Sequence, residues 1–323
     1  MSISRRTFLR AALASGALLP GGARAAFPDR PIRLVVPFAA GGAVDSIARV
    51  LGNALGTELG QAIVIENRGG AGGIIGMETV ARALPDGHTL LLSHTGFAAM
   101  PGLYRSLPFD PERDFAGVIT AASGAYVLAV NSSEPFHSVA DLVAYAKANP
   151  GRVTYGSAGV GSTVHLAGEF FKRTAGIDIV HVPYKGAVPA ITDLLSGQIR
   201  MLFAPAVNAI PLAASGKLRA LAVTSTRRSQ LAPEVPTVAE SGLPGFEVTG
   251  WYGIAAPAGS PADAVARLNM EANRVLKSDG VIVQLRLQGL NPAGGTPAEA
   301  NAWIKSEVVQ WRKVIRDAGI TPQ

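Results

Sequence analysis

The chain has 323 residues, a formal net charge of +6 and no cysteine. The absence of cysteine excludes disulfides, thiolate nucleophiles, cysteine-ligated zinc and a lipid anchor on an N-terminal cysteine. Lysine and arginine are scattered along the sequence, and only 6% of the residues are aromatic. A nucleic-acid partner is therefore not expected, because such proteins carry a basic stripe or interleaved aromatic residues.

Residues 1–25 have the pattern of an export signal. Arg5 and Arg6 precede a mildly apolar stretch over residues 11–19, and Ala23 and Ala25 stand before a predicted cleavage site. The paired arginines resemble a twin-arginine signal, which exports folded proteins. An ordinary secretory signal remains an alternative, because both types combine a basic start with an apolar core. The apolar stretch is shorter than the ~20 residues that span a bilayer, so we expect no membrane anchor.

Cleavage after Ala25 would leave 298 residues, which is enough for two domains. The removed segment carries four arginines and no acidic residue, so the net charge would fall from +6 to +2. We therefore expect a freely soluble protein of the periplasm, and the lack of cysteine is compatible with that oxidising compartment.

The first part of the mature chain alternates short apolar runs with helical patterns. The predicted strands are residues 32–36, 63–65 and 90–92, and the predicted helices are residues 43–55 and 74–83. Strands that are apolar throughout are buried on both faces, which is typical of a parallel sheet covered by helices. The sequence therefore predicts an α/β fold.

A second alternating set follows. Its predicted strands are residues 127–130, 153–155, 179–182, 201–203 and 218–223, and its predicted helices are residues 139–148, 163–174, 189–195 and 210–214. A last strand is predicted at residues 251–256. Two long amphipathic helices, residues 261–277 and 297–317, come after it with only a loop expected between them. Trp303 and Trp311 recur at helical spacing, so we expect both in the core.

The two final helices need a sheet to cover, and we place them back on the first set of strands. Lobe 1 would then comprise residues 26–123 and 249–323, and lobe 2 would comprise residues 124–248. A chain that crosses twice between lobes makes a two-hinge clamshell of the kind that closes around ligands.

Three glycine-rich corners, residues 37–45, 67–73 and 155–163, each lead from a strand into a helix. Glycine permits positive φ and close approach, while free N–H groups and the helix dipole favour an anion. Ser157, Ser162 and Thr163 add hydroxyl donors. Alternatively, the glycines only permit tight turns and the hydroxyls only cap helices. Corners from both lobes favour one shared anion cleft.

Two titratable residues follow these corners. Asp45 falls in the first turn of its helix, where a carboxylate interacts favourably with the dipole, and a direct ligand role is the alternative. His165 shares a helix face with Ser162 and Glu169. We expect His165 to contact a ligand or the core rather than a metal, because no further metal ligands stand at a recognisable spacing.

The common enzyme motifs are incomplete. Gly70 and Gly72 lack the third glycine of a dinucleotide fingerprint, residues 215–218 lack the final hydroxyl of a phosphate-binding loop, and no nucleophile elbow is present. We therefore expect no enzyme. An exported hydrolase of carboxylates would have to use Ser162, His165 and Glu169 from one helix, which is poor geometry.

Several motifs together resemble the solute-receptor family of tripartite tricarboxylate transporters, often called Bug receptors, over essentially the whole mature chain. They are Pro37-Phe38 with Gly41-Gly42 and Asp45, Asn67 with residues 70–73, residues 85–90, residues 155–157 with Gly161-Ser162 and His165, and residues 181–186, 216–224 and 235–237.

This resemblance implies a two-lobed type II periplasmic-binding-protein fold (a Venus flytrap), each lobe a mostly parallel sheet flanked by helices. It implies a small carboxylate ligand, held by backbone amides, small hydroxyls and bridging water, and delivered to membrane permease subunits of a tripartite transporter. A receptor that signals to a partner is the alternative. The expected protein is a monomer that needs no cofactor and no metal.

The candidate ligand-binding residues come from this resemblance and from the corners. They are Phe38, Gly41, Gly42, Ala43, Asp45, Ser157, Gly161, Ser162, Thr163, His165 and Ala204, with Lys185 as a less secure addition. Ala204 stands where the family usually has an aspartate, and Arg200 stands where an acidic residue is common. Their absence disfavours amino acids, whose ammonium group needs an acceptor.

Overall fold

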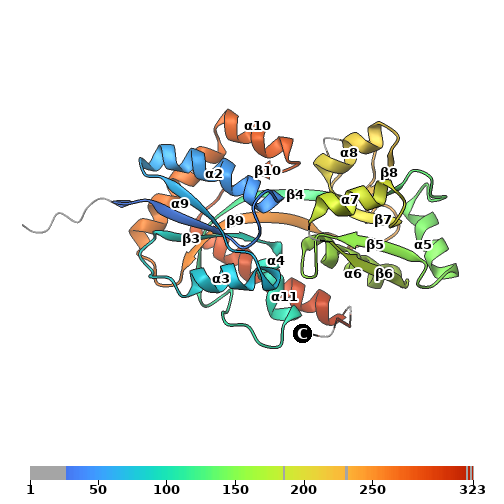
Figure 1. Cartoon of the computed structure of the whole chain (residues 1–323), viewed down its shortest axis with the longest axis horizontal. Helices are drawn as coiled ribbons and strands as arrows, with labels where there is room; N and C mark the ends of the chain where they lie inside the picture. Colours follow the sequence, from blue (N-terminus) through green and yellow to red (C-terminus); the bar gives the residue numbers. More distant parts are fainter. Residues whose placement is uncertain (1–26, 185, 230–231, 318, 321, 323) are drawn as a thin grey trace, which may run out of the picture.

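The computed structural model describes residues 27–317 except 185, 230 and 231, together with residues 319, 320 and 322. The expected signal and Lys185 lie outside these described residues. Figure 1 shows two lobes side by side, connected through the middle by the long strands β4 (Phe115–Asn131) and β9 (Thr249–Pro257). None of the described helices is long and apolar enough to cross a membrane.

The sheet is mixed. Its strand order is β2-β1-β3-β9-β4-β7-β5-β6, and β8 and β10 also pair with β4. The remaining strands are β1 (Ile32–Val36), β2 (Ile63–Asn67), β3 (Thr89–His94), β5 (Val153–Ser157), β6 (Ile179–Pro183), β7 (Met201–Pro205), β8 (Leu218–Val223) and β10 (Asn291–Pro292). The expected parallel strands are β1 to β3 in one lobe and β5 to β7 in the other. The shared strands β4 and β9 run antiparallel to their neighbours.

Strand β4 belongs to the sheets of both lobes. Its residues from Phe115 to Ala125 pair with β9, whereas Tyr126 to Asn131 pair with β7 and β8. The chain therefore passes from one lobe to the other inside a hydrogen-bonded strand rather than through a loose linker.

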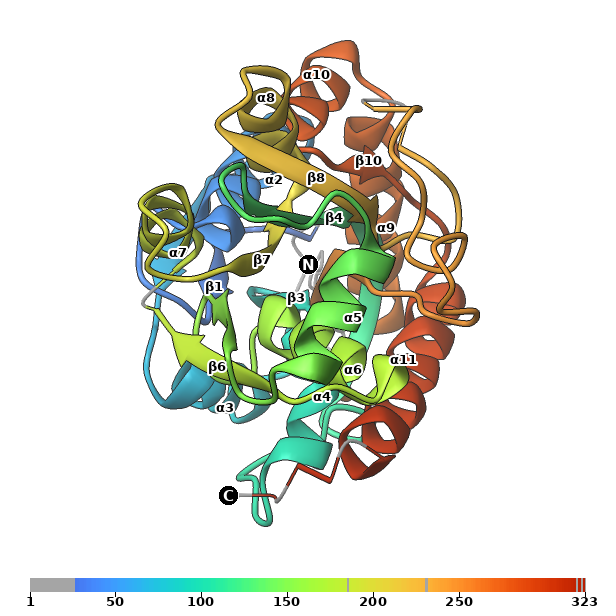
Figure 2. The ribbon, with the colours of Figure 1, turned by 90° about the vertical axis from the view of Figure 1, so that its right-hand side faces the viewer.

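Helices cover both faces of this sheet. They are α2 (Ala43–Leu59), α3 (Ile74–Ala81), α4 (Thr95–Leu103), α5 (Val139–Ala148), α6 (Thr163–Ala175), α7 (Ala187–Leu195), α8 (Ala206–Ala214), α9 (Ala262–Leu276), α10 (Asp279–Leu287) and α11 (Pro297–Asp317), with a short 3-10 turn at Ala71–Gly73. Viewed along the long axis in Figure 2, the sheet of lobe 2 lies between α7 and α8 on one side and α5 and α6 on the other.

Two sequence expectations about the helices are wrong. Helix α10 occupies the segment between the last two long helices, where only a loop was expected. It is short, and only Val281 and Leu285 are buried, so the sequence shows little helical periodicity in its apolar residues. Trp303 is 39% exposed, whereas Trp311 is 2% exposed. The buried face of α11 is formed by Ile304, Val308 and Trp311. Trp303 is one position before Ile304 and therefore lies to one side of this face.

One core cluster runs through both lobes. It holds Phe97 from α4, Phe171 from α6, Trp251 from β9 and Trp311 from α11. The buried carboxylate of Glu307 accepts hydrogen bonds from the indole nitrogens of Trp251 (2.7 Å) and Trp311 (3.1 Å). This contact fixes α11 against β9, so the last helix reinforces the connection between the lobes.

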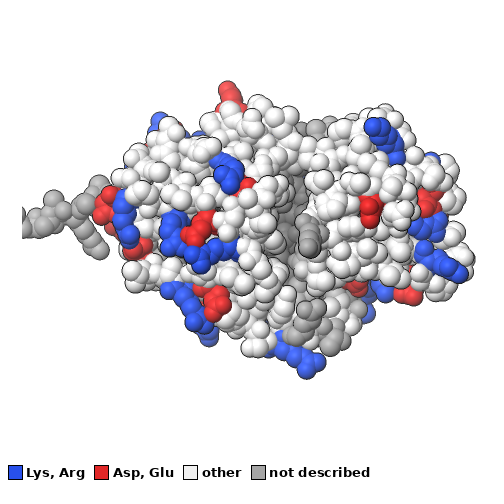
Figure 3. All heavy atoms as spheres, viewed as in Figure 1, with Lys and Arg blue, Asp and Glu red and all other residues white. Residues whose placement is uncertain are grey.

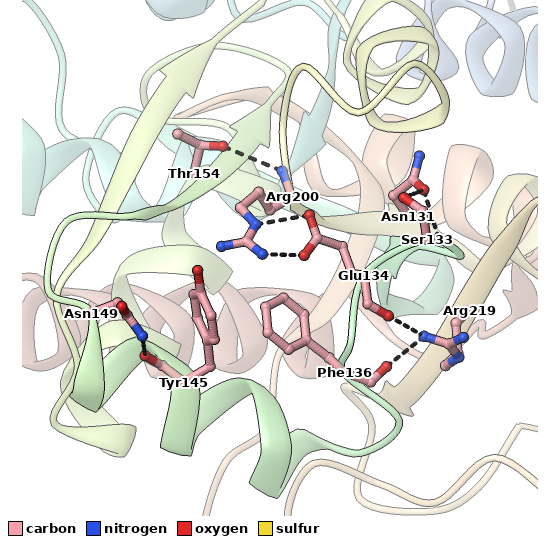
Figure 4. A network of polar contacts seen from close by, with 9 residues as sticks. All are labelled: Asn131, Ser133, Glu134, Phe136, Tyr145, Asn149, Thr154, Arg200 and Arg219. Atoms are coloured by element: carbon pink, nitrogen blue, oxygen red, sulfur yellow. Dashed lines mark hydrogen bonds and ion pairs between the residues drawn. The ribbon is translucent and has the colours of Figure 1, made fainter.

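The far end of lobe 2 is held together by a largely buried ion pair. Figure 4 shows the guanidinium of Arg200 facing both carboxylate oxygens of Glu134, with the rings of Phe136 and Tyr145 pointing toward it. The guanidinium carbon lies 5.0 Å from the Phe136 ring centre and 4.5 Å from that of Tyr145. Arg219 donates to the backbone oxygens of Glu134 and Phe136, which fixes the loop before α5.

Candidate functional site

The β1–α2 corner presents free backbone to solvent. Gly41, Gly42 and Ala43 are exposed, and Gly41 has a φ of +85°, which favours glycine. Helix α2 begins at Ala43, and its N-cap Gly42 supplies no side-chain cap. The first amides of α2 are therefore available to an anion.

Asp45 is built into this corner. Its side chain is almost wholly buried and accepts hydrogen bonds from the Gly41 amide (2.9 Å), from Arg49 Nε (3.0 Å) and from Asn67 Nδ2 (3.0 Å). Burial raises the pKa of Asp45, but the hydrogen bonds from Arg49, Gly41 and Asn67 outweigh it and hold the pKa below its usual value. The carboxylate thus orders the corner that a ligand would meet.

The second glycine-rich corner supports the first. Asn67 Nδ2 also donates to the backbone oxygen of Phe38 (3.1 Å). A Cβ at Gly76 would lie 2.8 Å from Pro37 Cα, so only glycine lets α3 pack this closely behind the corner.

The β5–α6 corner uses its hydroxyls internally. Ser157 is completely buried, and its Oγ accepts from the Gly159 amide (3.0 Å). Ser162 caps α6, because its Oγ accepts from the His165 amide (3.3 Å) and donates to the Gly159 oxygen (2.6 Å). Thr163 is buried, and its hydroxyl lies close to that of Tyr126.

Two histidines lie directly beneath this corner. His165 Nδ1 accepts from the Gly161 amide (3.3 Å), and its ring centre lies 4.3 Å from that of His181. Burial lowers the pKa of His165 to about 4, and burial together with His165 lowers the pKa of His181 to about 4. Both rings are therefore neutral at pH 7.

The alternative hydrolase arrangement is not assembled. The Tyr155 hydroxyl donates to Glu169 (2.5 Å), and Ser162 Oγ bonds to Gly159 rather than to His165 Nε2 or Nδ1. Among the described residues, no three metal-ligating side chains cluster, so the pair His165 and Glu169 is not extended into a metal site.

The corners of the two lobes approach each other across a furrow, which Figure 3 shows bordered mostly by uncharged residues. A Cβ on Gly96, in the first turn of α4, would lie 3.1 Å from the Gly161 oxygen. The Tyr126 hydroxyl also lies close to the hydroxyls of Thr163 of α6 and Tyr252 of β9. The start of α4 and the start of α6 therefore lie against each other, and Phe38 of the β1–α2 corner lies beside His94, the residue before α4.

One predicted residue lies in the core instead of at a corner. Ala204 is fully buried in the apolar cluster of lobe 2, together with Val127 and Leu202. Its methyl group therefore packs against core residues in this structure. Lys185 lies outside the described residues.

Sequence reasoning missed the corner after β3. His94 ends β3, is 6% exposed, and its ring centre lies 4.9 Å from that of Phe38. A signal was available: β1 and β3 are parallel neighbours, and the carboxyl ends of such strands meet at one edge of the sheet. The segment lacks the glycine-rich pattern that marks the other corners in the sequence.

Several known proteins are similar to this chain over most of their own length. A protein from the tcbD–tcbE intergenic region of Pseudomonas sp. (strain P51) is 42% identical over 90% of this chain and 87% of its own length. Protein BugT of Bordetella pertussis is 37% identical over 91% of this chain and 90% of its own length.

Solved structures agree in fold. Rpa4515 from R. palustris with adipate is 38% identical, with a TM-score of 0.84 over 92% of this chain and 100% of that chain. The periplasmic binding protein BugD is 35% identical, with a TM-score of 0.83 over 92% and 100%. MatC (Rpa3494) from Rhodopseudomonas palustris with bound malate is 33% identical, with a TM-score of 0.82 over 90% and 100%.

The family model described as "Tripartite tricarboxylate transporter family receptor" matches residues 47–320. This match covers most of the chain, and it agrees with the Bug proteins among the relatives and structures. The chain therefore belongs to the tripartite tricarboxylate transporter receptors, a family of periplasmic substrate-binding proteins.

Proposed function

We propose that this protein captures a small carboxylate between its two lobes and presents it to the membrane permease subunits of a tripartite tricarboxylate-type transporter. The observation that carries the proposal is that corners from both lobes gather around the end of β3. Phe38 of the β1–α2 corner lies against His94, and Gly96, two residues further on, lies against the Gly161 oxygen of the β5–α6 corner. Solved relatives are described with adipate and with malate, which are carboxylates.

The donors at this site are suited to an anion. The first turn of α2 is exposed and has no side-chain cap, so its N–H groups and the helix dipole favour negative charge. The ligand-binding residues proposed here are Phe38, Gly41, Gly42, Ala43, Gly161, Ser162, Thr163 and His165. Asp45 and Ser157 hold the two corners in shape.

Ligand capture would close the lobes on each other. We take lobe 1 as residues 26–123 and 249–323 and lobe 2 as residues 124–248, with bending in β4 and β9. The change of pairing partner at Ala125 and Tyr126 supports a hinge at this point of β4. Small-angle scattering tests it, because a saturating carboxylate should make a clamshell more compact.

The proposal includes export and the absence of catalysis. The segment with Arg5 and Arg6 would direct the chain to the periplasm and be removed after Ala25. A receptor releases its ligand unchanged. Incubation of purified protein with a carboxylate panel, followed by chromatography, should therefore recover every compound intact, whereas depletion would indicate an enzyme.

Binding can be tested by calorimetry with a matched pair of variants. Gly42→Leu places a bulky side chain at the exposed corner where an added Cβ has room. Gly280→Leu does the same in α10, where an added Cβ also has open space. We expect Gly42→Leu to abolish carboxylate binding with a nearly unchanged melting temperature, and Gly280→Leu to bind as wild type does. Equal binding by both variants would contradict the proposed site.

The ligand itself can be identified from the protein as purified. Denaturation of the periplasmic protein should release the compound bound during growth, and mass spectrometry would identify it. A carboxylate is the expected result, and a different class of bound compound would contradict the proposal.

A further inference from the structure

His181 lies on the edge strand β6, directly behind the β5–α6 corner. The strand is parallel to β5 and pairs His181 with Tyr155. The His181 ring packs against the rings of Tyr155 and His165, with centres 4.9 Å and 4.3 Å away. Its Nε2 lies 2.6 Å from Oγ of Ser157, a completely buried residue at the end of β5. His181 therefore contacts the residue from which the corner begins, although it is not among the predicted ligand-binding residues.

The direction of this hydrogen bond follows from the other partners of Ser157. Its Oγ accepts from the Gly159 amide (3.0 Å), and its one proton can go to His181 Nε2 (2.6 Å) or to the Gly159 oxygen (3.2 Å). The Gly159 oxygen already accepts from Ser162 Oγ (2.6 Å) and from the Ser162 amide (3.1 Å), which occupies both of its lone pairs. Ser157 therefore donates to His181, and the proton of the neutral ring is on Nδ1.

These contacts form a chain that holds the corner from behind. It runs from His181 through Ser157 to the Gly159 amide, and from the Gly159 oxygen to Ser162, the N-cap of α6. Gly159 has a φ of +118°, which favours glycine. Both polar groups of the Gly159 backbone are thus bonded within the corner. The first amides of α6 have no intrahelical partner, so they are the groups that remain for an anion.

From this geometry we propose that His181 is a positioning residue for ligand binding. It does not touch the carboxylate. By accepting the Ser157 proton it keeps the Ser157 hydroxyl in the orientation that holds Gly159, and this contact keeps the start of α6 in the place where the ligand is bound. The inference rests on the proposed function and adds to it a residue that sets the affinity from behind the site.

Two substitutions of His181 differ in whether an acceptor stays in place. His181→Gln can bring an amide oxygen to the position of Nε2, whereas His181→Asn is shorter and brings its amide only to the position of Nδ1. Both variants remove the ring, its titration and its contacts with Tyr155 and His165, so these losses cancel when the two are compared. Each is also combined with Ser157→Ala, which removes the hydroxyl through which His181 acts.

Calorimetry measures the effect on binding. The probes are acetate, malate, adipate and citrate, and the variants are compared on the one that wild type binds most tightly. We expect His181→Asn to weaken binding about five-fold, as for the loss of one hydrogen bond, and His181→Gln to stay within about two-fold of wild type. In the Ser157→Ala background the two variants should bind equally, because the hydroxyl that distinguishes them is gone.

A second measurement needs no ligand. In protein with ¹⁵N-labelled histidine at neutral pH, the His181 ring should carry its proton on Nδ1 and none on Nε2. Ser157→Ala removes the donor to Nε2 and should shift the Nε2 resonance. Ser196→Ala, at the exposed end of α7, is the control and should leave this resonance unchanged. A proton on Nε2 in wild type would overturn the assignment.

The outcomes separate this inference from the proposed function. If wild type binds a carboxylate but His181→Asn and His181→Gln bind it equally, or if His181→Asn weakens binding just as much without the Ser157 hydroxyl, the positioning role is wrong and the receptor function stands. If wild type binds none of the four carboxylates, the proposed function fails and the positioning role fails with it. Melting temperatures show whether the variants are folded, and the position of the proton on the wild-type ring decides the matter if they are not.

Discussion

Ser157 Oγ and His181 Nε2 lie 2.6 Å apart, directly beneath the corner that begins α6. Ser157 ends β5, and His181 lies on the neighbouring parallel strand β6. The contact joins the end of one strand to the next and places the His181 ring against that of His165, with centres 4.3 Å apart. Two neutral histidines therefore pack beneath the corner, and protonation of either ring at low pH would disturb this packing.

This pair should destabilise the protein as pH falls. Both pKa values are about 4 in the folded protein, whereas an unperturbed histidine has a pKa of 6.5. The folded values are depressed, so the stabilisation is complete above pH 6.5 and is lost as pH falls toward 4. In urea titrations from about pH 7.5 to about pH 4, His181→Asn should flatten this decline. The exposed His137→Asn is the control, and an equal effect from it would contradict the assignment.

Asp45→Asn should loosen the β1–α2 corner. The neutral amide loses the ion pair with Arg49 and places donors where Asn67 also donates, so we expect a loss of about 1 to 3 kcal/mol. Carboxylate affinity should fall as well, because the Gly41 backbone is no longer fixed. Denaturant unfolding and calorimetry measure both. Asp279→Asn, in the exposed first turn of α10, should leave both unchanged.

Arg200→Lys should reduce stability without changing ligand binding. Lysine cannot pair with both oxygens of Glu134 or lay a planar guanidinium against the rings of Phe136 and Tyr145, so a loss of about 1 to 3 kcal/mol is expected. Arg82 pairs with Glu78 on an exposed helix surface, so Arg82→Lys should lower the free energy of unfolding much less. A large fall in carboxylate affinity for Arg200→Lys would contradict the purely structural role.

The site should prefer anions without an ammonium group. The carboxylates on the two helices that begin at the β1–α2 and β5–α6 corners already have partners within the protein, since Asp45 of α2 bonds to Arg49 and Glu169 of α6 bonds to Tyr155. An ammonium brought into the closed cleft would lose water without an acidic acceptor. Succinate and glutarate should therefore bind about ten- to a hundred-fold more tightly than aspartate and glutamate. Tighter binding of the amino acids in a thermal-shift screen would reverse this conclusion.

Export should depend on the paired arginines. Replacing Arg5 and Arg6 together by Lys should leave unprocessed, folded protein in the cytoplasm, because the pair is recognised by the export machinery as an address. Arg10→Lys lies in the same signal outside the pair and serves as the control. Immunoblots of cell fractions measure the precursor. Normal periplasmic levels of the double variant would favour the ordinary secretory route.

The amino-acid sequence by itself determined most of the elements and the family. Apolar runs and helical periods predicted α5, β8 and α11 with the bounds that the structure has, because each combines a clear pattern with sharp ends. Glycine-rich corners predicted where two helices begin at the furrow. Each of these patterns depends only on residues that are neighbours in the chain, so the sequence alone is enough to predict these elements.

Only the tertiary structure decided which polar groups are left for a ligand. Ser157 was expected to offer its hydroxyl to a ligand, but its side chain bonds to His181. For Asp45 the sequence left a ligand role open beside an interaction with the helix dipole, and its side chain bonds to Arg49. Helix α4 was invisible to periodicity, because its residues from Thr95 to Met100 are all buried and show no polar face. His94 lies close to Phe38 and Gly161, which are 56 and 67 positions away in the chain. Proximity of this kind arises when strands from distant segments pair, and no local pattern encodes it.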